Sequence, residues 1–536
     1  MHPCEKIHGM RRRTPAYLLL LAFTAILMTA CERDDGAAAG VDSHDPPVLL
    51  KRGNGGDPQT LDPARAEDVH AFNVLLDLYE GLVMPGSNGD LVPGAATSWD
   101  ISDDGLRYSF HLRANAVWSN GEPLTAADFR ASLLRALAPE TASTYSFLLH
   151  PISNIAAPDA RTLILDLEVP APHLLSVLAM PVAFPVWSGA ASDDEQFSRP
   201  QHFVGNGPFV LDEWEPGHRI RLSKNNLFHA ANTVDIDTIE YYAIVDLQTE
   251  LNMYRAGELD ITASVPGGSF EDLRRNREDE LHIAPSLGVY YLAFDLSENP
   301  LDDRALRQAL TMAINRDALV EVIGRGEQPA YGLVPDGVTG YVPSRYGWSD
   351  LTPDERQAEA RRIFAGSRFA AARPQKLKLT YDTGDIHEKV ALAVSSMWRD
   401  VLGIDVELDK REWKYFLETR SRRDEWQVMR FAWTGDYNHA STFTDILQST
   451  SPQNLAGYEN SEYDEMLNAA AMADADAQSK LFASAEALML NDYPIAPLYF
   501  FVSKHLVSPS VEGFNNNVLD QHPSRYLRVK PAPAQP

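Results

Sequence analysis

The sequence has almost no cysteine: Cys4 and Cys31 are the two present among 536 residues. Two cysteines cannot build a disulfide framework or a cysteine-based metal site. The familiar catalytic patterns are missing as well, among them the G-x-S-x-G elbow, the H-E-x-x-H zinc motif, the Walker loop and a strand-linked G-x-G-x-x-G. We therefore expect no catalytic residues, no metal site, no cofactor and no enzymatic activity. An exported hydrolase is kept as an alternative, because catalytic groups can converge from distant segments.

Positive charge is scarce in this chain. Lysine and arginine number 47 against 75 aspartate and glutamate residues, which gives a formal net charge of −28 at pH 7. Such an excess of carboxylates repels a phosphate backbone, so we expect no nucleic-acid partner. Hydrophobic residues make up 44% of the chain and charged residues 23%, which is typical of a globular protein. At this length two or three lobes are expected, and we expect the protein to be a monomer.

Long apolar runs are missing except near the N-terminus. Three arginines at positions 11–13 precede an apolar run, residues 16–30, that ends at Cys31. A basic segment, a short apolar segment and small residues are typical of an export signal, and the run is too short to span a membrane comfortably. The ending LMTAC resembles a lipobox, which predicts that residues 1–30 are removed and that Cys31 receives a lipid. An ordinary cleaved signal peptide is the alternative.

The residues after the apolar run are small and polar, without periodicity. They predict a flexible tether over residues 31–47. A lipid on Cys31 would hold the mature protein to a membrane of the cell envelope, on the periplasmic side. Either Met1 or Met10 is the start of translation.

From about residue 48 the chain alternates strand-like and helix-like segments, which favours α/β lobes. Half-buried strands are predicted where apolar and polar residues alternate. In RYSFHLR, Tyr108, Phe110 and Leu112 share one face. In TLILDLEV, residues 163, 165, 167 and 169 share one face, and LKLTYD and GIDVEL have the same pattern.

Helices are predicted from their start signals. Thr125 and Thr352, each with an acidic residue three positions later, predict capping boxes at the start of TAADFRASLLRAL and TPDERQAEARRIFA. Asp302 or Asp303 is expected to cap one helix over RALRQALTMAINRDAL, residues 304–319.

Several segments, taken in order, resemble the extracellular solute-binding proteins, family 5. They are PQTLDPARAEDVHAFNVLLDLYEGL, LRANAVWSNGEPLTAADFRASLLRAL, GNGPFVLDEW, YRAGELDI, LDDRALRQALTMAINRDAL, YDTGDIHEKVALAVSSMW, MRFAWTGDYNHASTF and NDYPIAPLYFFVSKHLV. The resemblance runs from about residue 49 to residue 530. Within the family it is strongest to the periplasmic oligopeptide-binding members that serve ABC peptide importers.

The resemblance implies a fold and a function. The fold is an α/β, two-lobed periplasmic binding protein, class II-like and of cluster C, with an extra subdomain inserted in the first lobe. The implied function is to enclose a short peptide between the lobes and to hand it to the permease subunits of an ABC importer. The implied ranges are 48–80, 204–287 and 505–530 for lobe I, 81–203 for the inserted subdomain and 288–504 for lobe II.

The resemblance also implies which residues bind the charged ends of the peptide. Asp436, in TGDY, matches the aspartate that binds the peptide's ammonium group; a loop aspartate that caps a turn is the alternative. Arg430 and His387 match positions that hold the peptide's carboxylate, and arginine suits this role because its planar fork grips a carboxylate with two hydrogen bonds. For His387, close to an expected helix start, a capping or surface role is the alternative.

The other implied contacts lie along the peptide backbone. Ala432, Trp433 and Thr434 match the segment that pairs with it. Trp433 would also wall a side-chain pocket, with plain core packing as its alternative. On the first lobe the matching positions are Glu67, Asp68 and Val69, on a strand that pairs with the peptide, and Tyr145 near the cleft.

Some positions depart from the pattern of the family. Thr311 stands where close relatives have a lysine, Ala293 stands where they have an acid, and their cysteine pair maps near Gly288 and Thr434. These departures leave the guest open. A dipeptide, a murein peptide, an opine, an oligosaccharide or a nickel complex is the alternative within the fold, and an adaptor or holdase-like lipoprotein is the alternative outside it.

Overall fold

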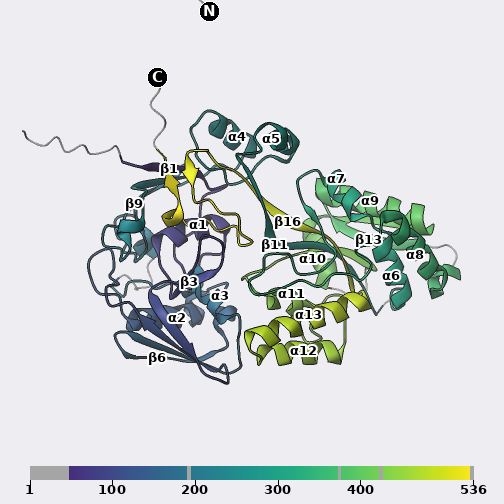
Figure 1. The fold of residues 1–536 in the computed structure, drawn as a ribbon, viewed down its shortest axis with the longest axis horizontal. Helices are drawn as coiled ribbons and strands as arrows, with labels where there is room; N and C mark the ends of the chain where they lie inside the picture. The colour runs from purple at the N-terminus through teal and green to yellow at the C-terminus, as the bar shows by residue number, and fades with distance from the viewer. Residues whose placement is uncertain (1–46, 190–194, 298, 372–375, 422–425, 531–536) are drawn as a thin grey trace, which may run out of the picture. The chain divides into compact units, whose positions relative to one another are not determined.

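The computed structural model describes residues 47–189, 195–297, 299–371, 376–421 and 426–530. The expected signal peptide, Cys31 and all but the last residue of the expected tether lie outside these ranges. Residues Pro47–Pro536 form one unit, and the elements below belong to it (Figure 1). Across the described ranges, every helix is too short or too polar to span a bilayer.

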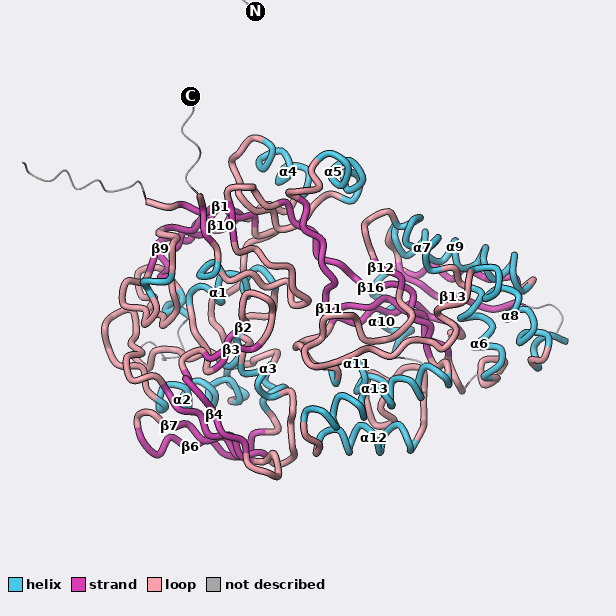
Figure 2. The backbone as a smooth tube through the Cα atoms, viewed as in Figure 1, coloured by secondary structure: helices cyan, strands magenta, loops and turns pink. Residues whose placement is uncertain are grey.

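The largest sheet has six strands in the order β12-β16-β11-β15-β13-β14. Its two long strands, β11 (Leu281–Phe294) and β16 (Ile495–Leu506), pair antiparallel and run side by side in Figure 2. Strand β15 (Val428–Thr434) is antiparallel to β11 and parallel to β13. The remaining strands are β12 (Gln328–Pro329), β13 (Lys376–Asp382) and β14 (Asp405–Arg411).

Two four-stranded sheets and two short ladders complete the strands of the described ranges. The first sheet has the order β1-β10-β9-β8 and the second the order β4-β5-β7-β6. Their strands are β1 (Leu49–Gly53), β10 (Thr238–Tyr242), β9 (Arg219–Lys224), β8 (Phe209–Glu215), β4 (Ala96–Ile101), β5 (Arg107–Leu112), β7 (Thr162–Leu167) and β6 (Ile152–Asp159). The ladders are β2 (Val83–Pro85) with β3 (Leu91–Pro93) and β17 (Val511–Glu512) with β18 (Arg528–Val529).

The helices are interleaved with these strands along the chain. They are α1 (Val69–Leu78), α2 (Ala126–Leu137), α3 (Leu174–Leu178), α4 (Leu247–Arg255), α5 (Phe270–Asn276), α6 (Arg304–Ala313), α7 (Arg316–Ile323), α8 (Pro353–Ala365), α9 (Asp385–Leu402), α10 (Trp413–Ser421), α11 (Ser441–Thr444), α12 (Ser461–Ala471) and α13 (Ala475–Asp492).

The buried apolar side chains form separate cores. One core contains the six-stranded sheet and draws almost all its residues from 287–500. A second surrounds the β4-β5-β7-β6 sheet and draws mainly on residues 82–183. A third combines residues from the N-terminal part, residues 203–261 and the last strands. Chain segments far apart in sequence thus share one core, while the boundaries of the lobes stay a prediction.

Alternating patterns predicted two of the half-buried strands well. Tyr108, Phe110 and Leu112 are buried on one face of β5, as predicted. In β7 the expected face is also buried up to Leu167. The prediction is wrong at Val169, which is 57% exposed, because the strand and its pairing with β6 end at Leu167.

The helix starts predicted from capping signals are confirmed for α2 and α8. The backbone N–H of Thr125 donates to the Asp128 carboxylate over 2.8 Å, and that of Thr352 donates to Glu355 over 2.9 Å. At α6 the cap is Asp303, whose side chain accepts from the N–H of Ala305.

The single helix expected over residues 304–319 is wrong. The chain forms α6, leaves the helical conformation at Ile314 (φ −80, ψ 117) and starts α7 behind a second cap, Asn315. The Asn315 side chain accepts from the N–H of Ala318, and asparagine is among the preferred capping residues. Buried Arg316 stabilises the break, because its guanidinium donates to the carbonyls of Thr311 and Ile314 at the end of α6.

Gly288 lies opposite Thr434 across β11 and β15, so the two positions at which the resemblance predicts a cysteine pair in relatives are direct partners in this sheet. A Cβ atom at Gly288 would lie 2.2 Å from Cδ2 of Phe501. We expect Gly288→Ala to lower the free energy of unfolding by about 1 to 3 kcal/mol, the usual cost of overpacking, in a urea titration. Gly347→Ala is the control, because that Cβ would meet nothing within 4 Å. Equal stability of the two variants would contradict the expected clash.

Candidate functional site

Strand β15 has one edge that is paired along its length and one that is mostly open. Against β11 it pairs from Val428 to Thr434, whereas against β13 the register includes Val428 and Met429 alone. Within the described residues, the backbone from Arg430 to Thr434 therefore has no strand on its β13 side. Unpaired N–H and C=O groups on such an edge are a template for adding another strand.

The side chains along this open edge are accessible in part. Ala432 and Thr434 are exposed, and Trp433 is half-buried. Trp433 packs against the core of the six-stranded sheet, yet its buried indole Nε1 finds no hydrogen-bond acceptor among the described residues. A buried donor without a partner costs free energy, so Trp433 packs in the core and also retains an unused donor.

A tight turn follows the open edge and carries Asp436. The N–H of Gly435 donates to the Leu287 carbonyl over 2.7 Å, and the N–H of Asp436 donates to Thr442 Oγ1 over 3.3 Å. A Cβ at Gly435 would lie 2.8 Å from Cγ2 of Thr442, so the close approach of this turn requires glycine. The turn holds Asp436 in place through its backbone and leaves its carboxylate out of the turn's hydrogen bonds.

Asp436 is half-buried, and burial raises the pKa of its carboxyl above the ordinary value. Within the described part of the chain, this carboxylate accepts no hydrogen bond and forms no ion pair with a basic side chain. A partly desolvated carboxylate without a cation is unfavourable. Asp436 is therefore ready to accept a positive charge from outside the chain.

Tyr145, from the first part of the chain, lies near both Asp436 and Glu67. Burial raises the pKa of Tyr145, and the negative charges of Asp436, Glu67 and Asp68 raise it further. The ring of Tyr145 lies 5.9 Å from that of Phe72 on α1. Exposed Glu67 accepts a hydrogen bond from Thr144 Oγ1 over 2.7 Å. The structure thus brings together Tyr145, Asp436 and the acidic segment before α1.

The strand expected at Asp68 and Val69 is wrong, because these residues begin a helix. Asp68 is the N-cap of α1 and accepts from the N–H of Ala71 over 2.8 Å. Val69 is the first residue of α1, with 57% of its surface exposed. Backbone N–H groups in the first turn of a helix lack intrahelical acceptors, so Val69 can still donate to a guest, from a helix start and not from a strand.

Arg430 and His387 lie together at the other end of β15, around Asp382. Arg430 Nε donates to Asp382 Oδ1 over 2.5 Å, and its Nη2 contacts the same oxygen. His387 Nε2 lies 3.9 Å from Asp382 Oδ2, and its Nδ1 is 3.2 Å from the hydroxyl of Tyr290. The two positions predicted to hold a carboxylate are therefore neighbours.

The charge of Arg430 is less available than the sequence suggests. Its side chain is 10% exposed and already paired with Asp382, and its guanidinium carbon lies 4.9 Å from the ring centre of Phe416. Burial, followed by the charge of Arg430, lowers the pKa of His387 below its ordinary value, although Asp382 opposes this. His387 is accordingly neutral near pH 7 and acts as a hydrogen-bonding group and not as a cation.

Sequence reasoning missed Asp382 and Tyr290, the partners of these two residues. Asp382 stands in a segment that matches the family and Tyr290 does not, but the signal for their contacts is tertiary, since β11, β13 and β15 meet only in the folded sheet. Thr311, where the resemblance predicts a lysine in close relatives, is fully buried in α6, and its hydroxyl has no partner among the described residues. Ala293 is buried in β11 opposite Met429.

The residues just after Asp436 contact a different segment. The ring of Tyr437 stacks on His173 at 4.7 Å, and Ser176 Oγ donates to the carbonyl of Asn438 over 3.4 Å. A cavity of about 310 Å³ lies beside these contacts, lined by Leu175, Asn438 and His439 among others. The turn that presents Asp436 is thus held from both sides, a feature with no signal in the sequence patterns.

Comparison with known proteins gives a family for this fold. The sequence model of the family of bacterial extracellular solute-binding proteins, family 5 (middle), matches residues 90–454 of this chain. The periplasmic oligopeptide-binding protein OppA of Escherichia coli strain K12 is 35% identical over 490 residues, which are 87% of this chain and 89% of that protein. The probable deoxycholate-binding periplasmic protein YgiS of the same strain is 35% identical over 505 residues, 90% of this chain and 94% of that protein.

Among solved structures, the chain is similar to MppA, a periplasmic murein tripeptide binding protein in its unliganded open form. The TM-score is 0.85 at 31% identity, with 90% of this chain and 98% of that chain covered. This similarity confirms the expected α/β fold of the two-lobed periplasmic binding proteins. The individual ligand contacts stay predictions.

Proposed function

Because the chain belongs to the bacterial extracellular solute-binding proteins, family 5, we propose that it is the substrate-binding component of an ABC importer and that its guest is a short peptide. The permease subunits of the importer are its partners. It acts as a monomer on the periplasmic side, held to a membrane by a lipid on Cys31, and it performs no catalysis. The peptide lies between the two lobes with the boundaries predicted from the sequence.

The open edge of β15 is the observation that carries this proposal. An extended peptide laid beside Arg430 to Thr434 completes the missing strand, and main-chain hydrogen bonds of this kind are the same for every peptide sequence. Exposed Ala432 and Thr434 leave room for a guest next to the strand. Binding of many different peptides requires such contacts to the shared backbone.

The two ends of the site supply the charges that a free peptide needs. Asp436, without a cation of its own, receives the peptide's ammonium group in a charge-assisted hydrogen bond. Tyr145 lies near the same point, with Glu67 on the side of the first part of the chain. The peptide's carboxylate lies toward Arg430 and His387, where Asp382 already balances part of the positive charge. The carboxylate contact is therefore the weaker of the two.

Blocked peptides test the proposal. In a calorimetric titration, the free tripeptide is expected to bind and its N-acetyl form to show no measurable binding. The C-terminal amide is expected to bind more weakly than the free tripeptide, but with a smaller loss than the N-acetyl form. The order follows because Asp436 is unpaired while Arg430 is already paired with Asp382. Equal affinity for the free and the N-acetyl peptide would contradict the assignment of the ammonium site.

A second experiment identifies the guest without choosing it in advance. Native mass spectrometry of the purified full chain is expected to find a mixture of short peptides bound one per chain. Deoxycholate, the ligand in the name of one relative, is the matched negative ligand, since it has a carboxylate but no ammonium group to pair with Asp436. A single non-peptide guest in the spectrum would contradict the proposal.

A further inference from the structure

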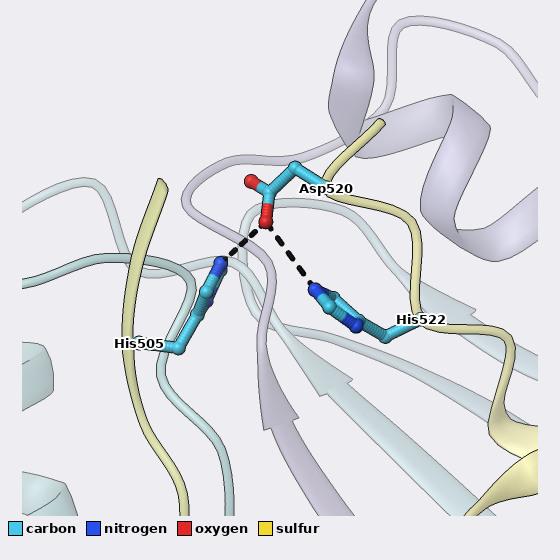
Figure 3. A group of neighbouring side chains, drawn as sticks. All are labelled: His505, Asp520 and His522. Atoms are coloured by element: carbon cyan, nitrogen blue, oxygen red, sulfur yellow. Dashed lines mark hydrogen bonds and ion pairs between the residues drawn. The ribbon is translucent and has the colours of Figure 1, made fainter. Parts of the chain in front are cut away.

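Three side chains that could bind a metal ion converge near the end of β16. His505 is in the strand itself, whereas Asp520 and His522 lie in the segment between β17 and the short helical turn Ser524–Tyr526. His505 Nε2 is 2.7 Å and His522 Nε2 is 3.3 Å from the same oxygen, Oδ1 of Asp520. Figure 3 shows both rings pointing toward that carboxylate from opposite sides. The sequence predicted no metal site, because these residues are neighbours only in the fold.

The environment of the two imidazoles holds them in the orientation of ligands. His505 Nδ1 lies 2.8 Å from the carbonyl of Thr262. A hydrogen bond from Nδ1–H to a backbone carbonyl is the usual arrangement around a metal-bound histidine. In the structure Nε2 donates its own proton to Asp520 Oδ1, and a metal ion at this place would displace that proton. The ring of His522 stacks on Phe514 at 3.8 Å. Both histidine side chains are less than a tenth exposed.

The spacing of the three atoms suits a small cation. Zinc binds histidine nitrogen and carboxylate oxygen at about 2.0 to 2.2 Å in a tetrahedral arrangement, which places neighbouring ligand atoms about 3.3 Å apart. The distance from His522 Nε2 to Asp520 Oδ1, 3.3 Å, already has this length. The distance from His505 Nε2 to the same oxygen, 2.7 Å, is that of a hydrogen bond. The ligand atoms all lie within 4.8 Å of one another. A small outward shift of His505 would admit the ion.

We propose that His505, Asp520 and His522 bind one divalent transition-metal ion, with Zn²⁺ as the ion that fits best. Two imidazoles and one carboxylate are a ligand set that zinc and other first-row transition metals accept. The three residues also line a cavity of about 220 Å³, together with Val69 and His70. The fourth coordination position opens toward this cavity, where a water molecule or a donor group of a small ligand completes the tetrahedron.

Arg52 is the group that opposes a cation at this place. Its Nη1 donates to the carbonyl of His522 and to Ser524 Oγ, which brings a positive charge close to the ligands. Buried Asp77, which receives hydrogen bonds from Tyr241 and from the N–H of Ser524, balances that charge. Because Asp77 balances the charge of Arg52, the Asp520 carboxylate remains available to a metal ion.

A bound ion would connect parts of the chain that are distant in sequence. His505 belongs to β16, which pairs with β11 along the largest sheet, and its ring also contacts the carbonyl of Thr262. Asp520 and His522 belong to the C-terminal segment, whose neighbour Leu527 is part of the core around the β1-β10-β9-β8 sheet. The ion would therefore tie the end of a long central strand to the segment that leads into β18.

Calorimetric titration of the full chain with ZnCl₂ tests the proposal, on protein purified without a polyhistidine tag. One Zn²⁺ per chain is expected with a Kd in the micromolar range or tighter. Loss of a residue that hydrogen-bonds to a metal ligand commonly lowers metal affinity by about 10- to 100-fold. His522→Gln and Asp520→Asn remove ligands themselves, so each should weaken Zn²⁺ binding by at least about 100-fold.

His218→Gln is the matched control, because His218 contacts a single carboxylate, Glu215, over 2.8 Å at the surface. This variant should bind Zn²⁺ like the unaltered chain. Co²⁺ bound to the unaltered chain provides a measurement that needs no variant, since tetrahedral coordination gives an intense visible absorption band and octahedral coordination a weak one. Absence of a one-to-one Zn²⁺ site, a weak Co²⁺ band, or Zn²⁺ affinity unchanged in His522→Gln would each overturn the proposal.

Discussion

Replacing Asp436 by asparagine is expected to weaken the binding of a free tripeptide by at least tenfold, which corresponds to about 1.4 kcal/mol. Asparagine keeps the size of the side chain and removes the negative charge that faces the peptide's ammonium group. The Asp436 carboxylate has no other cation within the described residues, so nothing in the described chain replaces the lost attraction. Isothermal titration calorimetry measures the change directly.

The control for Asp436→Asn is Asp350→Asn, which removes the same charge from an exposed position. It should leave tripeptide affinity unchanged, so that a general effect of net charge is separated from the local contact. The N-acetyl tripeptide should not distinguish Asp436→Asn from the unaltered protein, because it has no ammonium group. An unchanged tripeptide affinity in Asp436→Asn would remove the role assigned to this residue.

The raised pKa of Asp436 gives the same contact a pH dependence. The ionised carboxylate binds the ammonium group, so binding is fully present above the raised pKa and is lost as the pH falls through it. A carboxyl with an ordinary pKa would lose the contact at a lower pH. Calorimetry at decreasing pH should therefore show the affinity of the unaltered protein falling, while that of Asp436→Asn stays nearly constant over the same range.

The second large effect concerns stability. Asp382→Asn is expected to lower the free energy of unfolding by about 3 kcal/mol, because removal of one partner of a buried ion pair leaves the other charge uncompensated. Arg430 would then remain in the sheet, with its side chain 10% exposed and the ring of Phe416 beside it. Urea denaturation followed by circular dichroism measures the loss.

A double variant and a surface pair complete this experiment. Asp382→Leu combined with Arg430→Met should recover much of the stability, since apolar residues of similar volume often replace a buried ion pair at little cost. Glu359→Gln breaks a pair whose arginine, Arg362, is 72% exposed, and it should cost less than about 1 kcal/mol. Equal losses for Asp382→Asn and Glu359→Gln would show that the Arg430 pair contributes no more than a surface contact.

Local elements of the fold could be read from the sequence because each has a local cause. The alternation in RYSFHLR and the capping boxes at Thr125 and Thr352 depend on neighbours within a few residues, and they are confirmed. The break at Asn315 was missed because the helix pattern continues across it, and the interruption is stabilised by the buried guanidinium of Arg316. Strand order and the shared cores were not predicted, because they depend on contacts between segments far apart in the sequence.

In the candidate site, too, some features could be predicted from the sequence and others depend on the fold. The resemblance indicated Asp436 and Arg430, and the structure places Arg430 within β15 and Asp436 in the turn that follows it. It did not indicate that Asp382 already pairs with Arg430, nor that Val69 starts a helix. These facts depend on which strands meet and on where a capping side chain turns the backbone. His505 and His522 have no shared motif at all, since a strand and a distant loop bring them together.

The edge of β15 that faces β13 is unpaired beyond Met429 among the described residues. This edge also affects the tendency of the protein to self-associate. Unpaired N–H and C=O groups on a strand edge can pair with another chain, and native proteins usually shield them. Occupancy by a cargo peptide would supply that shield, so the loaded form should remain monodisperse at concentrations where the empty form begins to self-associate. Light scattering during removal of the cargo would follow this change as it happens.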